Sequence, residues 1–181
     1  MRLPLLSIFF LSMTATAQTP LDSELIAAAE RGDLPGVQKL IARGANVNAK
    51  DDKQDSAFLI ASANGHAAVV KATLAAGADL KSTNRYGGTG LIPACHHGHL
   101  ETVQLLLTTK IDVNHVNNLG WTALLEAVIL GDGGPTHTEI VRELLSHGAN
   151  PRIADREGVS ALEHARKRGY TRMSELLAKA G

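Results

Sequence analysis

The sequence is poor in aromatic residues and cysteine, and it has no excess of charge of either sign. Aromatic residues make up only 3% of the 181 residues, which argues against a core built on large rings. Because Cys95 is the only cysteine, neither an intramolecular disulfide nor a cysteine-rich zinc site can form. Eighteen basic residues balance 18 acidic ones, which excludes a basic nucleic-acid surface spread over the whole chain.

The N-terminal residues 1–17 have the pattern of an export signal. Arg2 is followed by an apolar run over 3–13 and by the small-residue cleavage pattern Ala15-Thr16-Ala17. The run is too short for a transmembrane helix, which needs about 20 residues, and no later segment is apolar enough to span a membrane. We therefore predict a signal peptide, residues 1–17, and a mature chain, 18–181, in the periplasm or, as a second choice, secreted.

The rest of the chain repeats itself. Five ten-residue segments begin with Ser or Thr, carry Ala at the sixth position and end with Gly: 23–32, 56–65, 89–98, 122–131 and 160–169. Their starts lie 33, 33, 33 and 38 residues apart, and the longer spacing holds a Gly- and Pro-containing insertion, 132–136. Such a period predicts a stack of similar units, each too small to bury a core by itself.

In this register the sequence resembles the ankyrin-repeat family. The resemblance rests on Gly65-His66 and Gly98-His99 and on the Gly-Ala-Asn/Asp motifs at 44–46, 77–79 and 148–150, and it covers essentially the whole mature chain. It implies an all-α ankyrin-repeat solenoid of about five helix-turn-helix repeats with β-hairpin loops. The expected repeats are 19–50, 51–83, 84–116, 117–154 and 155–181.

Two local features should affect the helix ends. The Ser or Thr that opens each segment is expected to cap its helix through the side-chain oxygen. Lys110 stands where the third repeat should close with Gly. If φ is positive there, the lysine is strained by about 1 kcal/mol, and Lys110→Gly should raise the melting temperature.

Few residues suggest chemistry. Cys95, His96, His97 and His99 lie close together, but their spacing matches no usual tetrahedral ligand set, so we expect structural roles and neither a metal nor a cofactor. Glu126 and His164 both occupy the fifth position of their segments, in adjacent repeats. We expect them to form a buried polar pair across the stack, more structural than functional, so that Glu126→Gln lowers stability near neutral pH.

The family resemblance implies a partner-binding surface made by hairpin tips and the exposed ends of the first helices. Apolar and aromatic side chains surrounded by charge are typical of a protein-binding hot spot. The candidate partner-binding residues are Arg85, Tyr86, His96, His97, Leu119, Trp121, Ile129 and Leu130. For Trp121 and Ile129 the alternative is packing against neighbouring repeats.

These observations predict a non-enzymatic, exported protein-protein interaction module that is monomeric and binds neither nucleic acid nor metal. The small exported bacterial ankyrin proteins that it resembles include ones linked to oxidative-stress protection and others suggested to inhibit a toxic enzyme. Metal or small-molecule binding through His96 and His97, or through Glu126 and His164, is an alternative. A hydrolytic enzyme is disfavoured because the sequence offers no nucleophile with an adjacent base.

Overall fold

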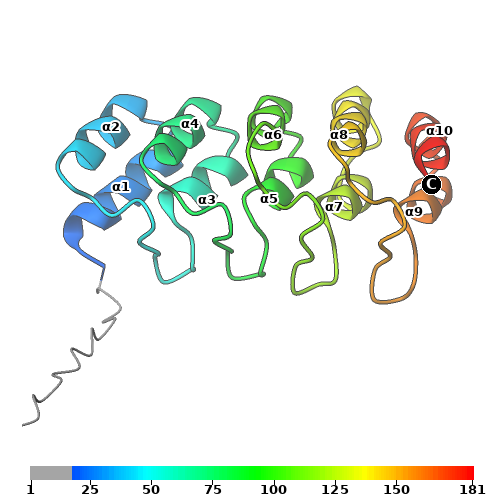
Figure 1. Ribbon diagram of the computed structural model, residues 1–181, viewed down its shortest axis with the longest axis horizontal. Coiled ribbons are helices and arrows are strands. Elements are labelled where there is room, and N and C mark those ends of the chain that lie inside the picture. The colour runs from blue at the N-terminus through cyan, green and yellow to red at the C-terminus, as the bar shows by residue number, and fades with distance from the viewer. Residues whose placement is uncertain (1–17) are drawn as a thin grey trace, which may run out of the picture.

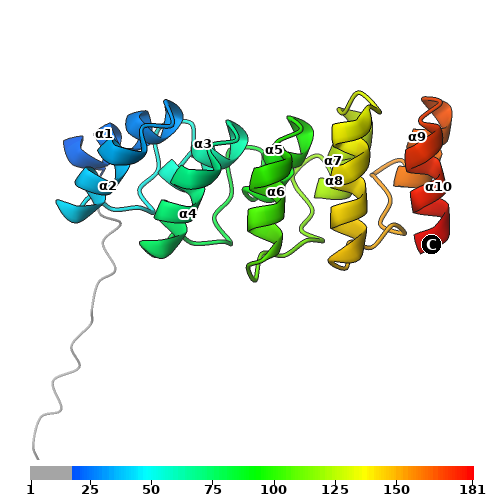
Figure 2. The ribbon, with the colours of Figure 1, turned by 90° about the horizontal axis from the view of Figure 1, so that it is seen from above.

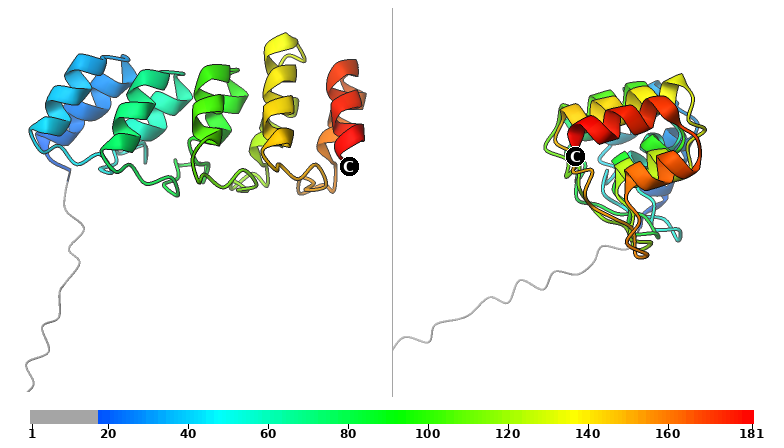
Figure 3. Two further views of the ribbon diagram at one scale, coloured as in Figure 1. Left: turned by 45° about the horizontal axis from the view of Figure 1, so that its top comes forward. Right: turned by 90° about the vertical axis from the view of Figure 1, so that its right-hand side faces the viewer.

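Helices arranged in antiparallel pairs make up the computed structural model, which describes residues 18–181. The first helices of the pairs form one layer, the second helices form another, and the loops between pairs project to one side (Figures 1 and 3). The axes turn gradually along the stack (Figure 2). The helices are α1 (Pro20–Glu30), α2 (Leu34–Ala42), α3 (Ala57–Ala63), α4 (Ala67–Ala75), α5 (Leu91–His96), α6 (Leu100–Leu107), α7 (Ala123–Ile129), α8 (Pro135–Ser146), α9 (Ala161–Lys167) and α10 (Thr171–Ala180).

The loops between pairs are tight hairpin-shaped turns. In each of four loops an Asp or Asn donates its backbone N–H to the carbonyl four residues later: Asp51–Asp55, Asn84–Gly88, Asn117–Trp121 and Asp155–Val159. The side-chain oxygen of the same Asp or Asn accepts from backbone N–H groups inside the turn, which fixes its shape. Across 18–181 these turns form no β-strand, and Ala154–Ser160 is an isolated antiparallel bridge.

In three of the five first helices, the predicted Ser or Thr caps the helix through its side chain. Ser56, Thr122 and Ser160 each accept a hydrogen bond from the backbone N–H three residues later. The expectation is wrong for Ser23, which lies inside α1, because Thr19 caps that helix.

The capping expectation is also wrong for Thr89. Its carbonyl would have to accept from Pro93, which has no N–H, and α5 instead begins at Leu91 with Gly90 as its N-cap. The Thr89 hydroxyl is buried and has no hydrogen-bond partner among the described residues.

The strain expected at Lys110 is absent. Gln54 is the only residue other than glycine with a positive φ in the described part of the chain, at 65°. In the third repeat the Ile111 N–H donates to the Thr109 hydroxyl over 3.2 Å. At the equivalent position of other repeats, the N–H groups of Ala45, Ala78 and Ala149 donate instead to a backbone carbonyl of the preceding helix. The turn after α6 therefore closes through the Thr109 side chain without a left-handed residue at Lys110, so the reason for expecting Lys110→Gly to stabilise is lost.

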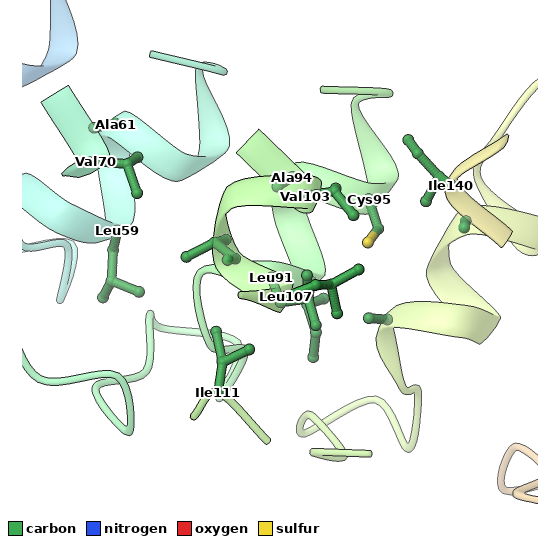
Figure 4. Packing of buried hydrophobic residues seen from close by; sticks show 14 of the residues in the cluster. Leu59, Ala61, Val70, Leu91, Ala94, Cys95, Val103, Leu107, Ile111 and Ile140 are labelled. Atoms are coloured by element: carbon green, nitrogen blue, oxygen red, sulfur yellow. The ribbon is translucent and has the colours of Figure 1, made fainter. Parts of the chain in front are cut away.

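The core runs continuously through the stack between the two helix layers. The alanine at the sixth position of each segment is buried, which lets neighbouring helices approach closely. Leu59 of the second repeat, Leu91 and Val103 of the third and Ile140 of the fourth pack around this seam (Figure 4). The fold therefore depends on small and aliphatic side chains, in agreement with the scarcity of aromatic residues.

The second helices of the last four pairs are also tied to the preceding repeat by a residue at or near their start. His66, His99 and His137 each place Nε2 3.0–3.1 Å from a carbonyl at the end of the preceding first helix, namely those of Glu30, Ala63 and His96. Tyr170 holds this position in the last repeat, and its hydroxyl donates to the Gly131 carbonyl over 3.0 Å. These bonds keep adjacent repeats in register.

The insertion at 132–136 is part of this contact. Asp132 Oδ1 accepts from the Gly134 N–H and lies 2.9 Å from His137 Nδ1, which folds the insertion back on the start of α8. A Cβ added to Gly133 would lie 2.3 Å from the Tyr170 ring, because the loop passes directly over that ring. The insertion therefore packs against the fifth repeat.

The signal peptide proposed for residues 1–17 lies outside the described residues. Within 18–181, none of the helices has the length and the apolar composition needed to cross a membrane.

Candidate protein-binding cleft

A cleft of about 340 Å³ opens between the projecting loops and the first helices in the middle of the stack. We call it the central cleft. Its walls come equally from the two kinds of element. The loops contribute Asp55, Asn84, Arg85, Tyr86, Gly88, Asn117 and Leu119, and the first helices with their ends contribute Ala63, Ile92, Pro93, His96, His97, Glu126 and Leu130.

Large apolar side chains surround the opening of the central cleft. Tyr86, Leu119 and Leu130 are 52%, 47% and 43% exposed, respectively. Asn84 and Asn117 hold the two loops that carry Tyr86 and Leu119, because each accepts backbone hydrogen bonds across its own turn. The opening is therefore apolar and supported by ordered loops.

The loop wall also carries one balanced pair of charges. The Arg85 guanidinium lies 3.5 Å from Asp55 Oδ2 in the preceding loop and stacks 4.8 Å above the Tyr86 ring. Burial raises the pKa of Asp55, as does the nearby Asp51, and Arg85 opposes this shift. Arg85 thus compensates one carboxylate of the cleft and positions the tyrosine.

A second carboxylate, Glu126, lies at the floor of the central cleft. Its side chain is only 7% exposed, Oε1 accepts from Asn117 Nδ2 over 3.0 Å, and Oε2 lies 3.7 Å from His96 Nδ1. Burial raises the pKa of Glu126 to about 7, against the opposing effect of the Asn117 hydrogen bond. Burial lowers the pKa of His96, and the neighbouring His97 and His137 add to that shift, so this imidazole compensates Glu126 poorly at neutral pH.

The histidines of the third repeat have separate surroundings. The rings of His96 and His97 stack with centroids 4.2 Å apart and 13° between their planes, whereas His99 faces the Ala63 carbonyl. In the part of the chain that the structure describes, no three His, Cys, Asp or Glu side chains are grouped as a metal site requires.

Cys95 lies on the core side of α5, facing Ile140 of α8 (Figure 4). The side chain is fully buried, and burial with the nearby Glu126 carboxylate raises the pKa of its thiol far above neutrality. Because thiolate is the reactive form, burial and the raised pKa disfavour reaction of Cys95 in the folded protein.

Comparison with known proteins identifies the family of this chain. The family described as Ankyrin repeats (3 copies) matches residues 25–117 and 94–181, two overlapping stretches that cover most of the chain. The chain belongs to the ankyrin-repeat family. The family expected from the sequence and the all-α repeat solenoid are therefore confirmed.

Similar ankyrin structures have been solved. An ankyrin repeat domain from Acinetobacter baumannii AYE is 50% identical with a TM-score of 0.86, over 91% of this chain and 87% of that one. Another ankyrin repeat protein is 39% identical with a TM-score of 0.81, over 86% of this chain and 79% of that one. The putative ankyrin repeat protein YahD of Escherichia coli K12 is 46% identical over 56 residues, 31% of this chain, and the matched part spans only 28% of YahD.

Ankyrin repeats form protein-protein interaction modules, and the family is generally a non-enzymatic scaffold. Of the residues predicted from the ankyrin resemblance to contact a partner, six line the central cleft. They are Arg85, Tyr86, His96, His97, Leu119 and Leu130.

The other two predicted partner-binding residues lie elsewhere. Ile129 is only 9% exposed, so its prediction as an exposed partner contact is wrong, and Trp121 is half-buried and packs against the core. Both line a neighbouring hollow of about 370 Å³ between the fourth and fifth ankyrin repeats, together with Arg156 and His164. Both side chains thus pack against the core, as the alternative for these two residues predicts.

The predicted pair between Glu126 and His164 does not form. Glu126 bonds to Asn117, and His164 Nε2 lies 2.7 Å from Asp155 Oδ2. Glu126 and His164 each contact the loop residue nine positions earlier in their own ankyrin repeat. Both occupy the fifth position of their segments, which faces the base of the loop in the same repeat. The nine-residue spacing was the signal that would have identified Asn117 as a member of the site.

Proposed function

We propose that this ankyrin chain binds a protein partner in the central cleft. One observation carries the proposal: three of the four large hydrophobic side chains that are exposed in residues 18–181 border this cleft. Those three are Tyr86, Leu119 and Leu130, and the fourth is Val116. Clustered exposed apolar residues with a charged surround are characteristic of interaction sites in proteins.

The proposed role is binding without catalysis. The cysteine nearest the cleft, Cys95, is buried with a raised thiol pKa, and it does not line the cleft. Glu126 is a carboxyl group of raised pKa, but its carboxylate oxygens face Asn117 and His96, and the thiol nearest to it is the buried Cys95. These features favour a recognition surface over an active site.

Export to the periplasm is the second part of the proposal, and it rests on the signal-peptide pattern of residues 1–17. N-terminal sequencing of the protein purified from its source tests it, with Gln18 expected as the first residue. An intact N-terminus on all of the purified protein would contradict export by this route. The proposed link to oxidative-stress protection rests on family resemblance. Because the Cys95 thiol is buried, we propose that this protection operates through a bound protein and not through that thiol.

Site-specific photocrosslinking tests the position of the binding surface. A benzoylphenylalanine placed at Tyr86 should crosslink to one dominant protein in source cells. The same group at Lys71, an exposed residue of α4 in the second-helix layer, serves as the matched control. Crosslinking of the same protein from position 71 and not from position 86 would place the interface on the opposite side and contradict the proposal.

A further inference from the structure

The floor of the central cleft holds a carboxyl group, Glu126, to which no basic residue of the described chain donates a hydrogen bond. Asp55 has Arg85 at 3.5 Å, so that carboxylate is paired. Glu126 has only the Asn117 amide at Oε1, and no hydrogen bond from residues 18–181 reaches Oε2. Its nearest basic group is His96 Nδ1 at 3.7 Å, beyond hydrogen-bonding distance.

A side chain as buried as Glu126 normally has a full set of partners. The Glu126 side chain is only 7% exposed and lines the cleft. Its Oε2 has no hydrogen-bond partner among the described residues, but it is not sealed off from solvent. This oxygen is therefore buried beneath the surface but open to the cleft. A buried carboxylate of this kind is stabilised most by a cation that carries its own hydrogen-bond donors.

The surroundings favour one particular cation. Tyr86 and the stacked rings of His96 and His97 offer flat aromatic surfaces along the walls, and Leu119 and Leu130 offer apolar surface for an aliphatic stem. A guanidinium group is planar, weakly hydrated and suited to stacking, whereas an ammonium is compact and strongly hydrated. Arg85 already stacks on Tyr86 in this way at the edge of the cleft.

We propose that the partner protein inserts an arginine side chain into the central cleft, where its guanidinium donates to Glu126 Oε2. The inserted arginine is the anchor of the partner segment. The residues beside this arginine in the partner are apolar, and they cover Tyr86, Leu119 and Leu130. This inference rests on the proposed function, because it names the chemistry of the partner at the same cleft.

A small probe tests the anchor without the partner. The protein purified after expression of the full chain is titrated with Nα-acetyl-arginine N-methylamide, and amide chemical shifts are followed by NMR. Saturable shifts are expected at Asn117 and Leu119, with the neutral citrulline analogue about tenfold weaker. Equal binding of the citrulline analogue, or of the lysine analogue, would overturn the proposal.

Substitution of the carboxylate supplies the second arm. Glu126→Gln keeps an oxygen for Asn117 Nδ2 and should weaken the arginine probe about tenfold, while Glu101→Gln, an exposed change on α6, should leave its affinity unchanged. In the wild type, the affinity for the arginine probe should rise between pH 6 and pH 8, as Glu126 ionises. Unaltered affinity in Glu126→Gln would overturn the anchor, whereas crosslinking from position 86 would still support the cleft as the interface.

Discussion

Asn117 Nδ2 donates a hydrogen bond of 3.0 Å to Glu126 Oε1, and this bond joins the base of a loop to the helix that follows it. The equivalent positions of the next repeat hold Asp155 and His164, which are 2.7 Å apart. In one repeat the acid is on the helix, and in the other it is on the loop beside a histidine. As a result, Asp155 has a basic partner at hydrogen-bonding distance, whereas the nearest basic group to Glu126 is His96 at 3.7 Å.

Replacing Glu126 by glutamine should stabilise the protein at alkaline pH. Burial raises the pKa of Glu126 from 4.5 to about 7, so the folded state binds this proton more tightly than the unfolded state. The stability that the protonated group confers is complete below pH 4.5 and is lost as the pH rises to 7. Glu126→Gln should therefore be about 1–3 kcal/mol more stable than wild type at pH 8.

Urea unfolding of both proteins across this range is the appropriate measurement. At pH 4.5 the advantage should fall below about 0.5 kcal/mol. Glu101→Gln, on the exposed surface of α6, should follow the wild type throughout. A variant that is less stable than wild type at pH 8 would instead support an ionic role for Glu126 in the fold, as the pairing with His164 had suggested.

The left-handed backbone strain that the sequence predicted at Lys110 occurs instead at Gln54. It has a φ of 65°, and Gly87, Gly120 and Gly158 hold the same place in the other loops with φ between 71° and 85°. Gln54→Gly should raise the free energy of unfolding by about 0.5–1 kcal/mol, since relief of left-handed strain exceeds the added freedom of the unfolded chain. Gln54→Ala keeps the Cβ and should give no such gain; equal stabilisation by both would exclude backbone strain as the cause.

Gly90 provides the space that Phe58 occupies in the preceding repeat. A Cβ at position 90 would lie 2.9 Å from Phe58 Cζ and from Ser62 Oγ, and the phenylalanine is buried. Gly90→Ala should therefore destabilise the protein by about 1–3 kcal/mol. In a Phe58→Leu background the same change should be milder by at least about 0.5 kcal/mol, and additive effects in this double-mutant cycle would contradict a direct clash.

Tyr170 should contribute to stability through its hydroxyl. That group donates to the Gly131 carbonyl, and the loss of this bond leaves a buried carbonyl without its partner. Tyr170→Phe is expected to lower the free energy of unfolding by about 1 kcal/mol in a urea titration. Tyr86→Phe, at an exposed tyrosine, is the control and should change it by less than about 0.5 kcal/mol; identical effects of the two changes would count against the bond.

The fold was readable from the sequence because a repeat stack depends on local, periodic signals. The Ser/Thr, Ala and Gly positions mark the same helix pair five times, so a departure in one repeat does not obscure the others. Thr89 shows the limit of this reasoning, since a proline four residues later shifts the helix start. Gln54 could have been found by aligning the loops with one another, because the other three have glycine there.

The site was less predictable because it depends on which face of a helix each neighbour covers. Tyr86 and Leu119 were identified from their loop positions, which always project. Ile129 was not, because its burial depends on the following repeat. The sequence marks Glu126 as unusual, but its partner is Asn117 in the loop of its own repeat and not His164 at the equivalent position of the next repeat.

The affinity of the crosslinked partner for the double variant Tyr86→Ala with Leu119→Ala tests the central claim most directly. Both side chains are about half exposed, so the variant should fold as the wild type does. With Lys71→Ala as the control, we predict a dissociation constant raised at least about tenfold for the cleft variant and unchanged for the control. An unchanged dissociation constant for the cleft variant would contradict the assignment of the central cleft as the binding site.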